Sequence, residues 1–418
     1  MMTEMKSVIE KTLKRGYLWA SLIYAFSIPL DQKLATVSLV LWFLLSITGF
    51  RKENINNNKE LSIFILIYLV YVISVFSSEN IAFKYLEYKL SFVLFPVIFF
   101  LQKYNRLQYN KVFKFFIFGL LASLLICIIN AIINSVSLQE TGVVFSPNVL
   151  EGKKGLNSVI QGGNYFFGDQ LSMFHQSVYF AIYLCLGSAI VLFNEVFSYR
   201  KRVLLIILFG IFIFLLSNKA GLLVYFTLLF LRILTFKSKK RYRLFFFLLM
   251  IGIFCSVVFV NPRYKESLRK VMAGELKIDK NARYDFKTRI LIWDSASELI
   301  ANKPILGYGI GDIQIELNQK YEEKQYNFLL RKKYNAHNQF MQMWLENGFA
   351  GIILLLLVYY LFFRRAFVSS DYQWFILSII VIFFINSLFE SIFNRFSGIS
   401  IFVFYGTMIL SLNRVNDV

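Results

Sequence analysis

Three side chains that could carry charge or move a proton stand in polar stretches of a largely apolar chain. His337, one of only two histidines, lies in "YNAHNQFMQMWLENGFAG". Arg289 lies in "YDFKTRILIW", and Lys219 lies in the short polar turn "LLSNKAGLL". A neutral imidazole can take a proton from a hydroxyl group, and guanidinium or ammonium groups suit a phosphate. Together they indicate charge stabilisation by cations and proton transfer to one base.

The same residues have structural explanations as well. His337 could cap the surface helix that follows it. Arg289 could pair with Asp285 or Asp294 on a solvated helix face. Lys219 could anchor its turn at a membrane interface. The residue types alone leave both readings open.

Other polar residues that are poorly explained as membrane anchors are expected on the same side of the membrane. His175 stands where the apolar run of residues 172–193 starts, where it could cap that run or bind a ligand. Scattered positions that converge on one face are typical of a site between helices. The further candidate substrate contacts are Lys84, Lys89, Trp293, Asn338, Glu390 and Arg395.

Several kinds of site are not indicated. No acidic cluster of metal-ligand type and no serine nucleophile elbow occurs, so we expect neither a metal nor a cofactor. Gly307, Gly309 and Gly311 lack the preceding strand and the spacing of a dinucleotide fingerprint, and we interpret them as a turn. The cysteines lie singly in apolar runs and are predicted to be buried: Cys127, Cys185 and Cys255.

The elements that must position these residues are apolar helices. Hydrophobic residues make up 57% of the 418 residues and charged residues 17%, which indicates an all-α polytopic membrane protein. We predict about twelve spans, at residues 17–30, 34–50, 61–77, 88–101, 112–134, 172–193, 203–216, 220–235, 244–260, 349–363, 373–388 and 398–413.

The basic residues predict the orientation of these spans. The net charge of +20 is concentrated in short tracts at every second connection, which is a topology signal rather than a nucleic-acid surface. We therefore expect both chain ends in the cytoplasm and the long connection of residues 136–171 outside. The predicted parts are a tail (1–16), nine spans (17–260), a large outer loop (261–348), and three spans with a short tail (349–418).

The outer loop contains the pattern of an amphipathic helix. Apolar residues that recur at helical spacing are Phe286, Ile290, Trp293 and Ile300, and Asp285 could serve as the N-cap. We expect the helix to end before Pro304.

Parts of this loop resemble a known family. The run "AHNQFMQMWLENGFAGIILLLLVYYLFF" is similar to the signature of the O-antigen ligase and polymerase superfamily of bacterial membrane glycosyltransferases, through His337, Asn338, Gln342, Glu346, Gly348 and Gly351. The stretches "TRILIWDSASELIANKPILGYGIG", "LLSNKAGLL" and "FESIFNRFSGISIFVFYGTMIL" also resemble family motifs. Many members have arginine where this chain has Lys219.

The resemblance implies a helical fold of the integral-membrane glycosyltransferase (GT-C-like) type and a metal-independent, inverting enzyme of the bacterial inner membrane, facing the periplasm. Its donor would be an undecaprenyl-diphosphate-linked glycan. His337 would be the catalytic base, and Arg289 and Lys219 would bind the diphosphate. We expect a ligase with a lipid A core acceptor; the alternatives are a polymerase of lipid-linked repeats and, in another class, a polysaccharide or lipid exporter.

Overall fold

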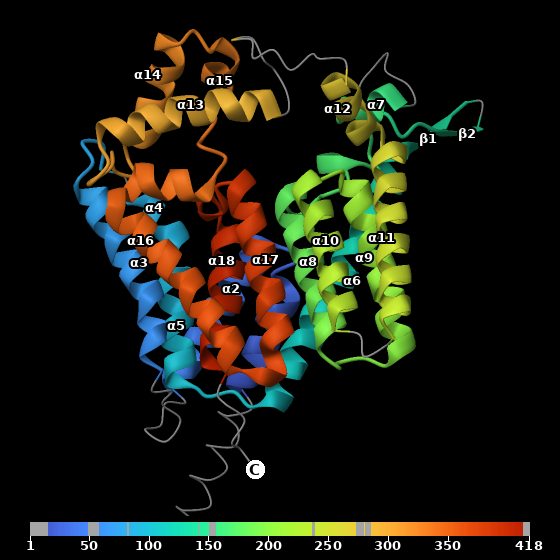
Figure 1. Ribbon diagram of the computed structural model, residues 1–418, viewed down its shortest axis with the longest axis horizontal. Helices are drawn as coiled ribbons and strands as arrows, with labels where there is room; N and C mark the ends of the chain where they lie inside the picture. The colour runs from blue at the N-terminus through green and yellow to red at the C-terminus, as the bar shows by residue number, and fades with distance from the viewer. Residues whose placement is uncertain are drawn as a thin grey trace, which may run out of the picture. The chain divides into compact units, whose positions relative to one another are not determined.

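The computed structural model describes residues 16–48, 58–81, 83–140, 142–149, 156–235, 239–272, 280 and 286–412. These residues are almost entirely helical (Figure 1). The chain divides into two compact units, each built from two stretches of sequence. Unit 1 comprises Met1–Gly49 and Tyr104–Ala273, and unit 2 comprises Phe50–Lys103 and Gly274–Val418.

Every one of the predicted apolar segments contains a helix. Within the described residues, four helices are long and apolar enough to cross a membrane by length and composition: Lys59–Phe76, Arg106–Ser135, Lys240–Val260 and Gln339–Val368. The other helices do not combine this length with this composition, so the count of twelve spans stays a prediction. The helices of these segments are residues 16–27, α2 (Gln32–Thr48), α3 (Ser62–Phe76), α5 (Ser91–Leu101), α6 (Arg106–Ser135), α8 (Ser177–Phe193), α9 (Tyr199–Leu216), α10 (Lys219–Leu234), α11 (Lys240–Val260), α16 (Gln339–Val368), α17 (Gln373–Phe389) and α18 (Phe396–Ser411).

In unit 1, helix α8 forms the centre. Thirteen of its residues, from Tyr179 to Val191, are buried without interruption, as expected for a helix that is apolar on all sides and surrounded by others. Helix α11 is apolar after its basic first turn, yet it buries none of its residues. Cys255 on α11 is consequently exposed, so its prediction as a buried residue was wrong, whereas Cys127 and Cys185 are buried.

A short β-hairpin and three small helices complete unit 1. Strands β1 (Val136–Gln139) and β2 (Gly142–Phe145) pair antiparallel, with Val136 opposite Phe145. The all-α prediction did not include this hairpin. Gly142 has a φ of 117° at its turn, a conformation that glycine adopts at little cost. The other elements are α7 (Leu156–Ile160), the 3₁₀ helix η3 (Gly168–Gln170) and α12 (Pro262–Met272).

In unit 2, α18 occupies the centre and is buried from Ser397 to Ser411. It packs against α5 and α16, and α16 packs against α3 and α17. Helix α13 (Phe286–Asn302) runs across one end of these helices, with α14 (Ile313–Glu323) and α15 (Asn327–Lys332) beyond it (Figure 1). The remaining elements of unit 2 are α4 (Lys84–Lys89) and the 3₁₀ helices η2 (Lys59–Leu61), η4 (Ser370–Tyr372) and η5 (Ile392–Asn394).

Helix α13 ends before Pro304 as predicted, but its buried face differs from the predicted one. Ile292, Ala296 and Leu299 are buried in a core shared with α14 and α15. Trp293 and Ile300, which were expected on the buried stripe, are only partly buried. The helix is covered on two sides, by α14 and by α16, so no single stripe accounts for its packing. Asp285, the expected N-cap, lies outside the described residues.

Helix α16 is broken at Gly348. This glycine has φ 60° and ψ −153°, a combination that residues with a side chain avoid. The break is bridged by the turn before α14, because Phe349 N–H donates to the carbonyl of Ile305 at 3.0 Å and Tyr308 N–H donates to that of Leu345 at 2.8 Å. The glycines of this stretch therefore do form a turn, with positive φ at Gly307.

Candidate functional site

His337 occupies a strained position directly before α16. Its φ is 42°, which is uncommon for a residue with a side chain. Its N–H donates to Asn335 Oδ1 at 3.0 Å, and the next residue, Asn338, caps α16 by accepting from the N–H groups of Phe340 and Met341. The capping role weighed for His337 thus belongs to Asn338. The imidazole is edge-on to the ring of Tyr334.

The imidazole of His337 contacts the carboxylate of Glu390. His337 Nδ1 lies 3.1 Å from Glu390 Oε2, and the two side chains are 24% and 14% exposed. Glu390 is the C-cap residue of α17. With its proton on Nδ1, the imidazole donates to the carboxylate and keeps the Nε2 lone pair available as a base. The described residues contain no group of three or more His, Cys, Asp or Glu side chains that could hold a metal ion.

Two more predicted residues bind the main chain just before Glu390. Arg289 Nη2 donates to the carbonyl of Phe389 at 3.1 Å, and its guanidinium lies over the Phe389 ring. Asn338 Nδ2 donates to the carbonyl of Leu388 at 3.3 Å. The end of α17 is therefore joined by side chains to both α13 and α16.

The residue before His337 is held from two sides. Trp293 Nε1 donates to the carbonyl of Ala336 at 3.1 Å. The N–H of Ala336 donates to Gln342 Oε1 at 3.0 Å. Trp293 was expected to contact substrate, but its indole N–H here fixes the backbone that carries His337.

Lys89 reaches the other end of the same connection. It is 3% exposed, its Nζ donates to the carbonyl of Phe393 at 3.0 Å, and the N–H of Phe393 donates to Gln339 Oε1. Burial lowers the pKa of the Lys89 ammonium to about 8, although the charge of Glu346 raises it. Lys89 ends α4, so the predicted span of residues 88–101 begins later, at Ser91 of α5.

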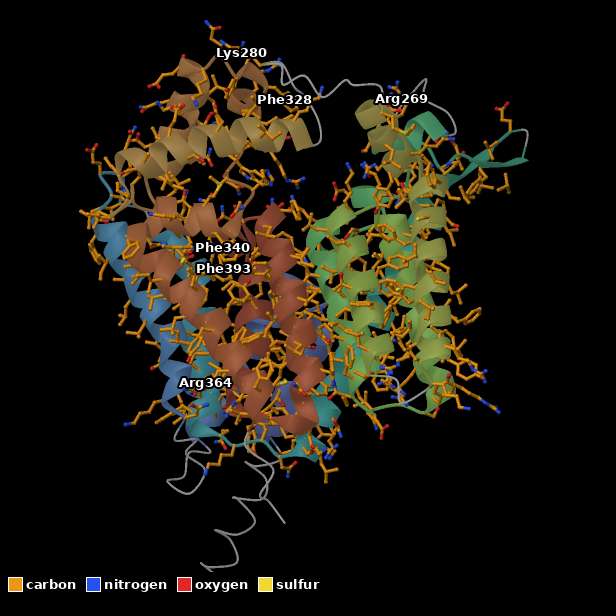
Figure 2. The ribbon with its side chains drawn as sticks, viewed as in Figure 1. Arg269, Lys280, Phe328, Phe340, Arg364 and Phe393 are labelled. Carbon is orange, nitrogen blue, oxygen red and sulfur yellow. The ribbon has the colours of Figure 1, made fainter. Side chains whose placement is uncertain are left out.

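Four predicted site residues thus bind residues 388–395, which we call the 388–395 segment; they are His337, Arg289, Asn338 and Lys89. They lie at the end of α16 opposite to Arg364, which pairs with Glu60. Figure 2 shows Arg364 at one end of unit 2, with Phe340 and Phe393 nearer the other. Of the other predicted site residues, Glu390 belongs to this segment and Trp293 binds Ala336, directly before His337.

Two other predicted residues of unit 2, Lys84 and Arg395, are exposed. Lys84 is exposed on α4, and its ammonium lies over the neighbouring ring of Tyr85. Arg395 is exposed at the start of α18. Both stay predictions as substrate contacts.

Lys219 belongs to unit 1. It is the first residue of α10, after the N-cap Asn218, and Ser217 before it has a φ of 51°. Its exposed Nζ donates to Ser267 Oγ on α12 at 2.7 Å. Lys219 therefore adds positive charge to the N-terminus of a helix of 16 residues, where anions are stabilised. Its predicted partnership with Arg289 stays a prediction.

His175, the second histidine, is buried in unit 1 outside α8. It is 5% exposed, its Nε2 lies 3.2 Å from the carbonyl of Pro29, and its ring is edge-on to Tyr183. Burial lowers the pKa of His175 to about 4, although the Pro29 and Ile28 carbonyls and Asp31 raise it. A neutral, buried imidazole suits a structural role in this loop better than binding an anion.

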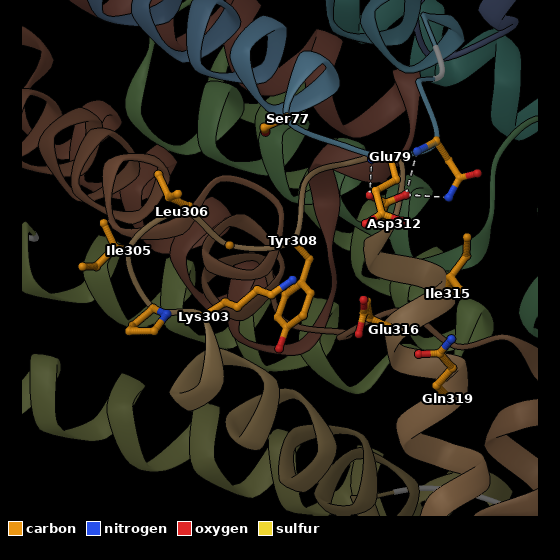
Figure 3. A pocket seen from close by; sticks show the side chains of 13 residues that line it. Ser77, Glu79, Lys303, Ile305, Leu306, Tyr308, Asp312, Ile315, Glu316 and Gln319 are labelled. Atoms are coloured by element: carbon orange, nitrogen blue, oxygen red, sulfur yellow. Dashed lines mark hydrogen bonds between the residues drawn. The ribbon is translucent and has the colours of Figure 1, made fainter.

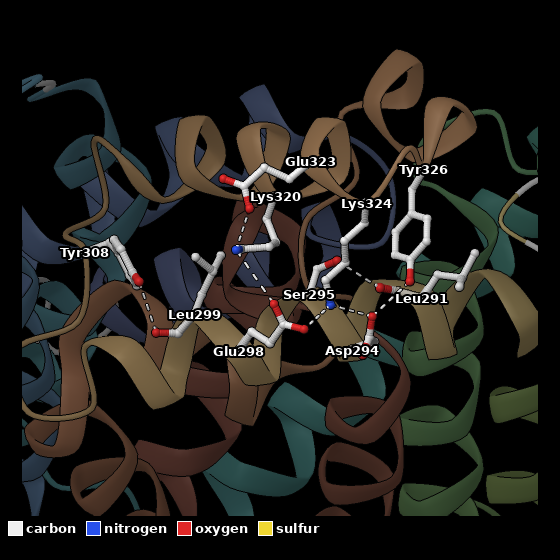
Figure 4. A network of polar contacts seen from close by, with 10 residues as sticks. All are labelled: Leu291, Asp294, Ser295, Glu298, Leu299, Tyr308, Lys320, Glu323, Lys324 and Tyr326. Atoms are coloured by element: carbon white, nitrogen blue, oxygen red, sulfur yellow. Dashed lines mark hydrogen bonds and ion pairs between the residues drawn. The ribbon is translucent and has the colours of Figure 1, made fainter.

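Asp294, the residue weighed as a partner of Arg289, belongs to a network on the other side of α13. Lys324 Nζ lies 2.6 Å from Asp294 Oδ2 and also pairs with Glu298. Tyr326 donates to Asp294 at 2.9 Å (Figure 4). Burial raises the pKa of Asp294, but the bonds from Lys324 and Tyr326 outweigh it, so the pKa lies below its ordinary value. The network joins α13 to α14 and α15.

The turn after α13 borders a cavity of about 580 Å³ in unit 2. Asp312 accepts hydrogen bonds from the N–H groups of Glu79 and Asn80 at 2.7 and 3.0 Å (Figure 3). Gly311 N–H donates to Ser78 Oγ. The predicted site residues are not among those that line this cavity. These contacts attach the turn to the end of α3.

Gln342 and Glu346 belong to the motif around His337, but no role was predicted for them from the sequence. Both are 3% exposed, and Gln342 Nε2 donates to Glu346 Oε1 at 2.7 Å. The signal was present, because Gln339, Gln342 and Glu346 recur at spacings of three and four residues. Polar residues at that spacing form one helix face, and here this face is buried.

The comparisons with known proteins agree with the resemblance seen in the sequence. Residues 204–356 match the family model described as O-Antigen ligase. The search of curated proteins found no match to the chain. The matched range includes Lys219, Arg289 and His337 but ends before Glu390.

Proposed function

We propose that this chain is a membrane glycosyltransferase, because residues 204–356 of this helical chain match the O-antigen ligase family model. It transfers a glycan from an undecaprenyl-diphosphate carrier to a sugar hydroxyl at the periplasmic face of the inner membrane. The acceptor is the lipid A core, which makes the chain an O-antigen ligase. The observation that carries the proposal is the contact between His337 and Glu390 beside Arg289.

In the proposed step, an acceptor hydroxyl oxygen attacks the anomeric carbon of the donor sugar. The bond from that carbon to the diphosphate oxygen breaks, and its electrons leave with the diphosphate. The hydroxyl proton moves to Nε2 of His337, and the resulting imidazolium is stabilised by Glu390, 3.1 Å from Nδ1. Attack on the face opposite the leaving group inverts the linkage.

Arg289 is the proposed cation for the leaving diphosphate in unit 2. A guanidinium carries five N–H donors in one plane and can bind two phosphate oxygens at once. Its hydrogen bond to the Phe389 carbonyl fixes the Arg289 side chain one residue along from Leu388, whose carbonyl Asn338 binds. A preorganised cation stabilises the charge that develops as the bond breaks.

Lys219 is the second proposed diphosphate ligand. An ammonium at a helix N-terminus attracts an anion, although it acts as a point charge rather than as a two-pronged donor. We propose no direct contact of Lys219 with the residues of unit 2. The transfer rate of Lys219→Arg measures its contribution.

A polymerase that joins lipid-linked repeats is the second candidate, because the O-antigen ligase family match fits either acceptor. A noncatalytic exporter is the rival from another class, and it would not need the pairing of His337 with Glu390. The test is transfer in vitro, with purified chain, an undecaprenyl-diphosphate-linked glycan, and lipid A core or a second lipid-linked glycan as acceptor. Transfer to lipid A core supports the ligase. Absence of transfer to any acceptor contradicts the proposal that the chain is an enzyme.

A further inference from the structure

A small polar cavity lies in unit 2 beside the 388–395 segment. Its volume is about 100 Å³, whereas one water molecule in the liquid takes up about 30 Å³. It can therefore hold a few hydroxyl groups rather than a whole saccharide. Among the residues that line it are Tyr85, Tyr88, Lys89, Gln342, Glu346 and Asn394.

Glu346 is the residue that most needs a ligand. Its side chain is 3% exposed, and Oε1 accepts from Gln342. Within the described part of the chain, Oε2 is buried and no donor lies within normal hydrogen-bond distance of it. The Tyr71 hydroxyl lies near this carboxylate, but it donates to Met343 Sδ at 3.1 Å. A buried carboxylate oxygen without a donor is costly. A hydroxyl group entering the cavity would supply that donor.

The neighbouring groups complete a recognition pattern for hydroxyls. The Lys89 ammonium has three N–H donors, one of which binds the Phe393 carbonyl, and it lies 3.9 Å from the centre of the Tyr71 ring. Carboxylate and amide oxygens accept from hydroxyls, and the ammonium donates to them. Tyr88 is 51% exposed at the cavity, and its ring can pack against the apolar face of a sugar ring.

We propose that this cavity is a subsite for the hydroxyl-bearing edge of a neutral sugar ring. The proposal rests on the proposed function, and it assigns the subsite to the acceptor. Gln342 connects the cavity to the catalytic residue, because it binds both Glu346 and the N–H of Ala336, one residue before His337. A sugar bound to Glu346 is thereby linked through Gln342 to the backbone that carries the base.

The test measures binding without transfer. Asn394 is exposed at the cavity. An Asn394→Cys variant is made in a Cys255→Ser background and placed in lipid nanodiscs. The rate at which its thiol is labelled then reports whether the cavity is occupied. We expect methyl glycosides of neutral hexoses or N-acetylhexosamines to slow labelling. Glu346→Gln abolishes this protection, whereas Glu79→Gln, which changes an exposed carboxylate of the same unit, retains it.

A second measurement uses transfer kinetics. We expect Glu346→Gln to raise the KM for the acceptor about tenfold, the worth of one hydrogen bond to a charged group, with the KM for the donor unchanged. The subsite is contradicted if a glycoside slows thiol labelling equally with and without Glu346→Gln. It is also contradicted if no glycoside slows labelling at all. Protection that depends on Glu346 in a chain that transfers nothing supports the subsite and contradicts the proposed function. If Glu346→Gln does not fold, Tyr88→Ala, on an exposed side chain, supplies the same comparison.

Discussion

Arg289 donates a hydrogen bond to the carbonyl of Phe389, the residue immediately before the Glu390 that contacts His337. One side chain of α13 therefore sets the position of the carboxylate that orients the imidazole. Arg289 is placed both to bind a leaving group and to hold the His337–Glu390 pair, so its substitution tests two functions at once.

The first prediction compares the two proposed cations. Arg289→Lys lowers transfer by about tenfold or more, because a point charge replaces a guanidinium that can bind two phosphate oxygens. Lys219→Arg retains activity, because it keeps the charge and adds donors. Initial rates at varied donor concentration measure both effects. Wild-type rates in both variants would mean that other groups hold the diphosphate.

The second prediction concerns the base and its partner. His337→Ala and His337→Gln each lower kcat by about a hundredfold or more, because glutamine can donate a hydrogen bond but cannot take the proton. Glu390→Gln retains the shape and lowers kcat by about tenfold or more, because it no longer stabilises the imidazolium. Donor binding, measured separately, stays nearly unchanged. Near-wild-type transfer by His337→Gln would remove His337 from the chemistry.

The third prediction follows from the lowered pKa of His175. Its value of about 4 in the folded chain lies below the ordinary 6.5, so the unfolded chain binds more protons between these pH values. The free energy of unfolding therefore falls as pH falls from about 6.5 towards 4. His175→Gln can still donate to Pro29 but does not titrate. We expect the melting temperature of the wild type to fall more steeply than that of His175→Gln; parallel pH profiles would contradict the buried, neutral imidazole.

The fourth prediction concerns the break in α16. A Cβ atom at position 348 would lie 2.0 Å from the Ile305 carbonyl oxygen, and the residue that carries it would have to adopt a φ of 60°. We expect Gly348→Ala to lower the free energy of unfolding by about 2 kcal/mol or more. Gly252→Ala is the matched control, because a Cβ atom there meets nothing within 4 Å on the helix α11. Similar denaturation curves for the two variants would mean that the break at Gly348 is not required.

The fifth prediction tests the orientation. Gln319 on α14 and Lys59 in η2 are both exposed in unit 2. In a Cys255→Ser background, we expect Gln319→Cys to react with an impermeant thiol reagent added to intact spheroplasts. Lys59→Cys should react only after the membrane is permeabilised. The reverse pattern would invert the predicted topology.

The apolar helices could be predicted from sequence because a membrane span needs a long run of apolar residues, and such runs are visible without knowing what packs where. The β-hairpin was missed because its strands have only four residues each. The buried face of α13 was misassigned because Ile292 and Trp293 are both apolar, and the choice between them depends on the neighbouring helices.

The candidate site could be predicted only in part. His337 and Arg289 stand out as isolated polar residues, but the contact of His337 with Glu390 joins positions 53 residues apart. Lys89 comes from still further away, over 304 residues, to reach Phe393. Such pairings arise from the order in which helices pack, which the local pattern does not contain. The buried role of Glu346 likewise depends on which side of α16 is covered.

The 388–395 segment is recognised mostly through its main chain. Arg289, Asn338 and Lys89 donate to carbonyl groups, and Gln339 accepts from an N–H group. Carbonyl and N–H groups are the same in nearly every amino acid, so most side chains there can change over evolution without loss of these contacts. The number of residues between Leu388 and Phe393 cannot change in the same way, because one insertion or deletion would shift the carbonyl and N–H groups away from the side chains that bind them. We therefore expect related chains to differ in the amino-acid sequence of this segment but to keep its length.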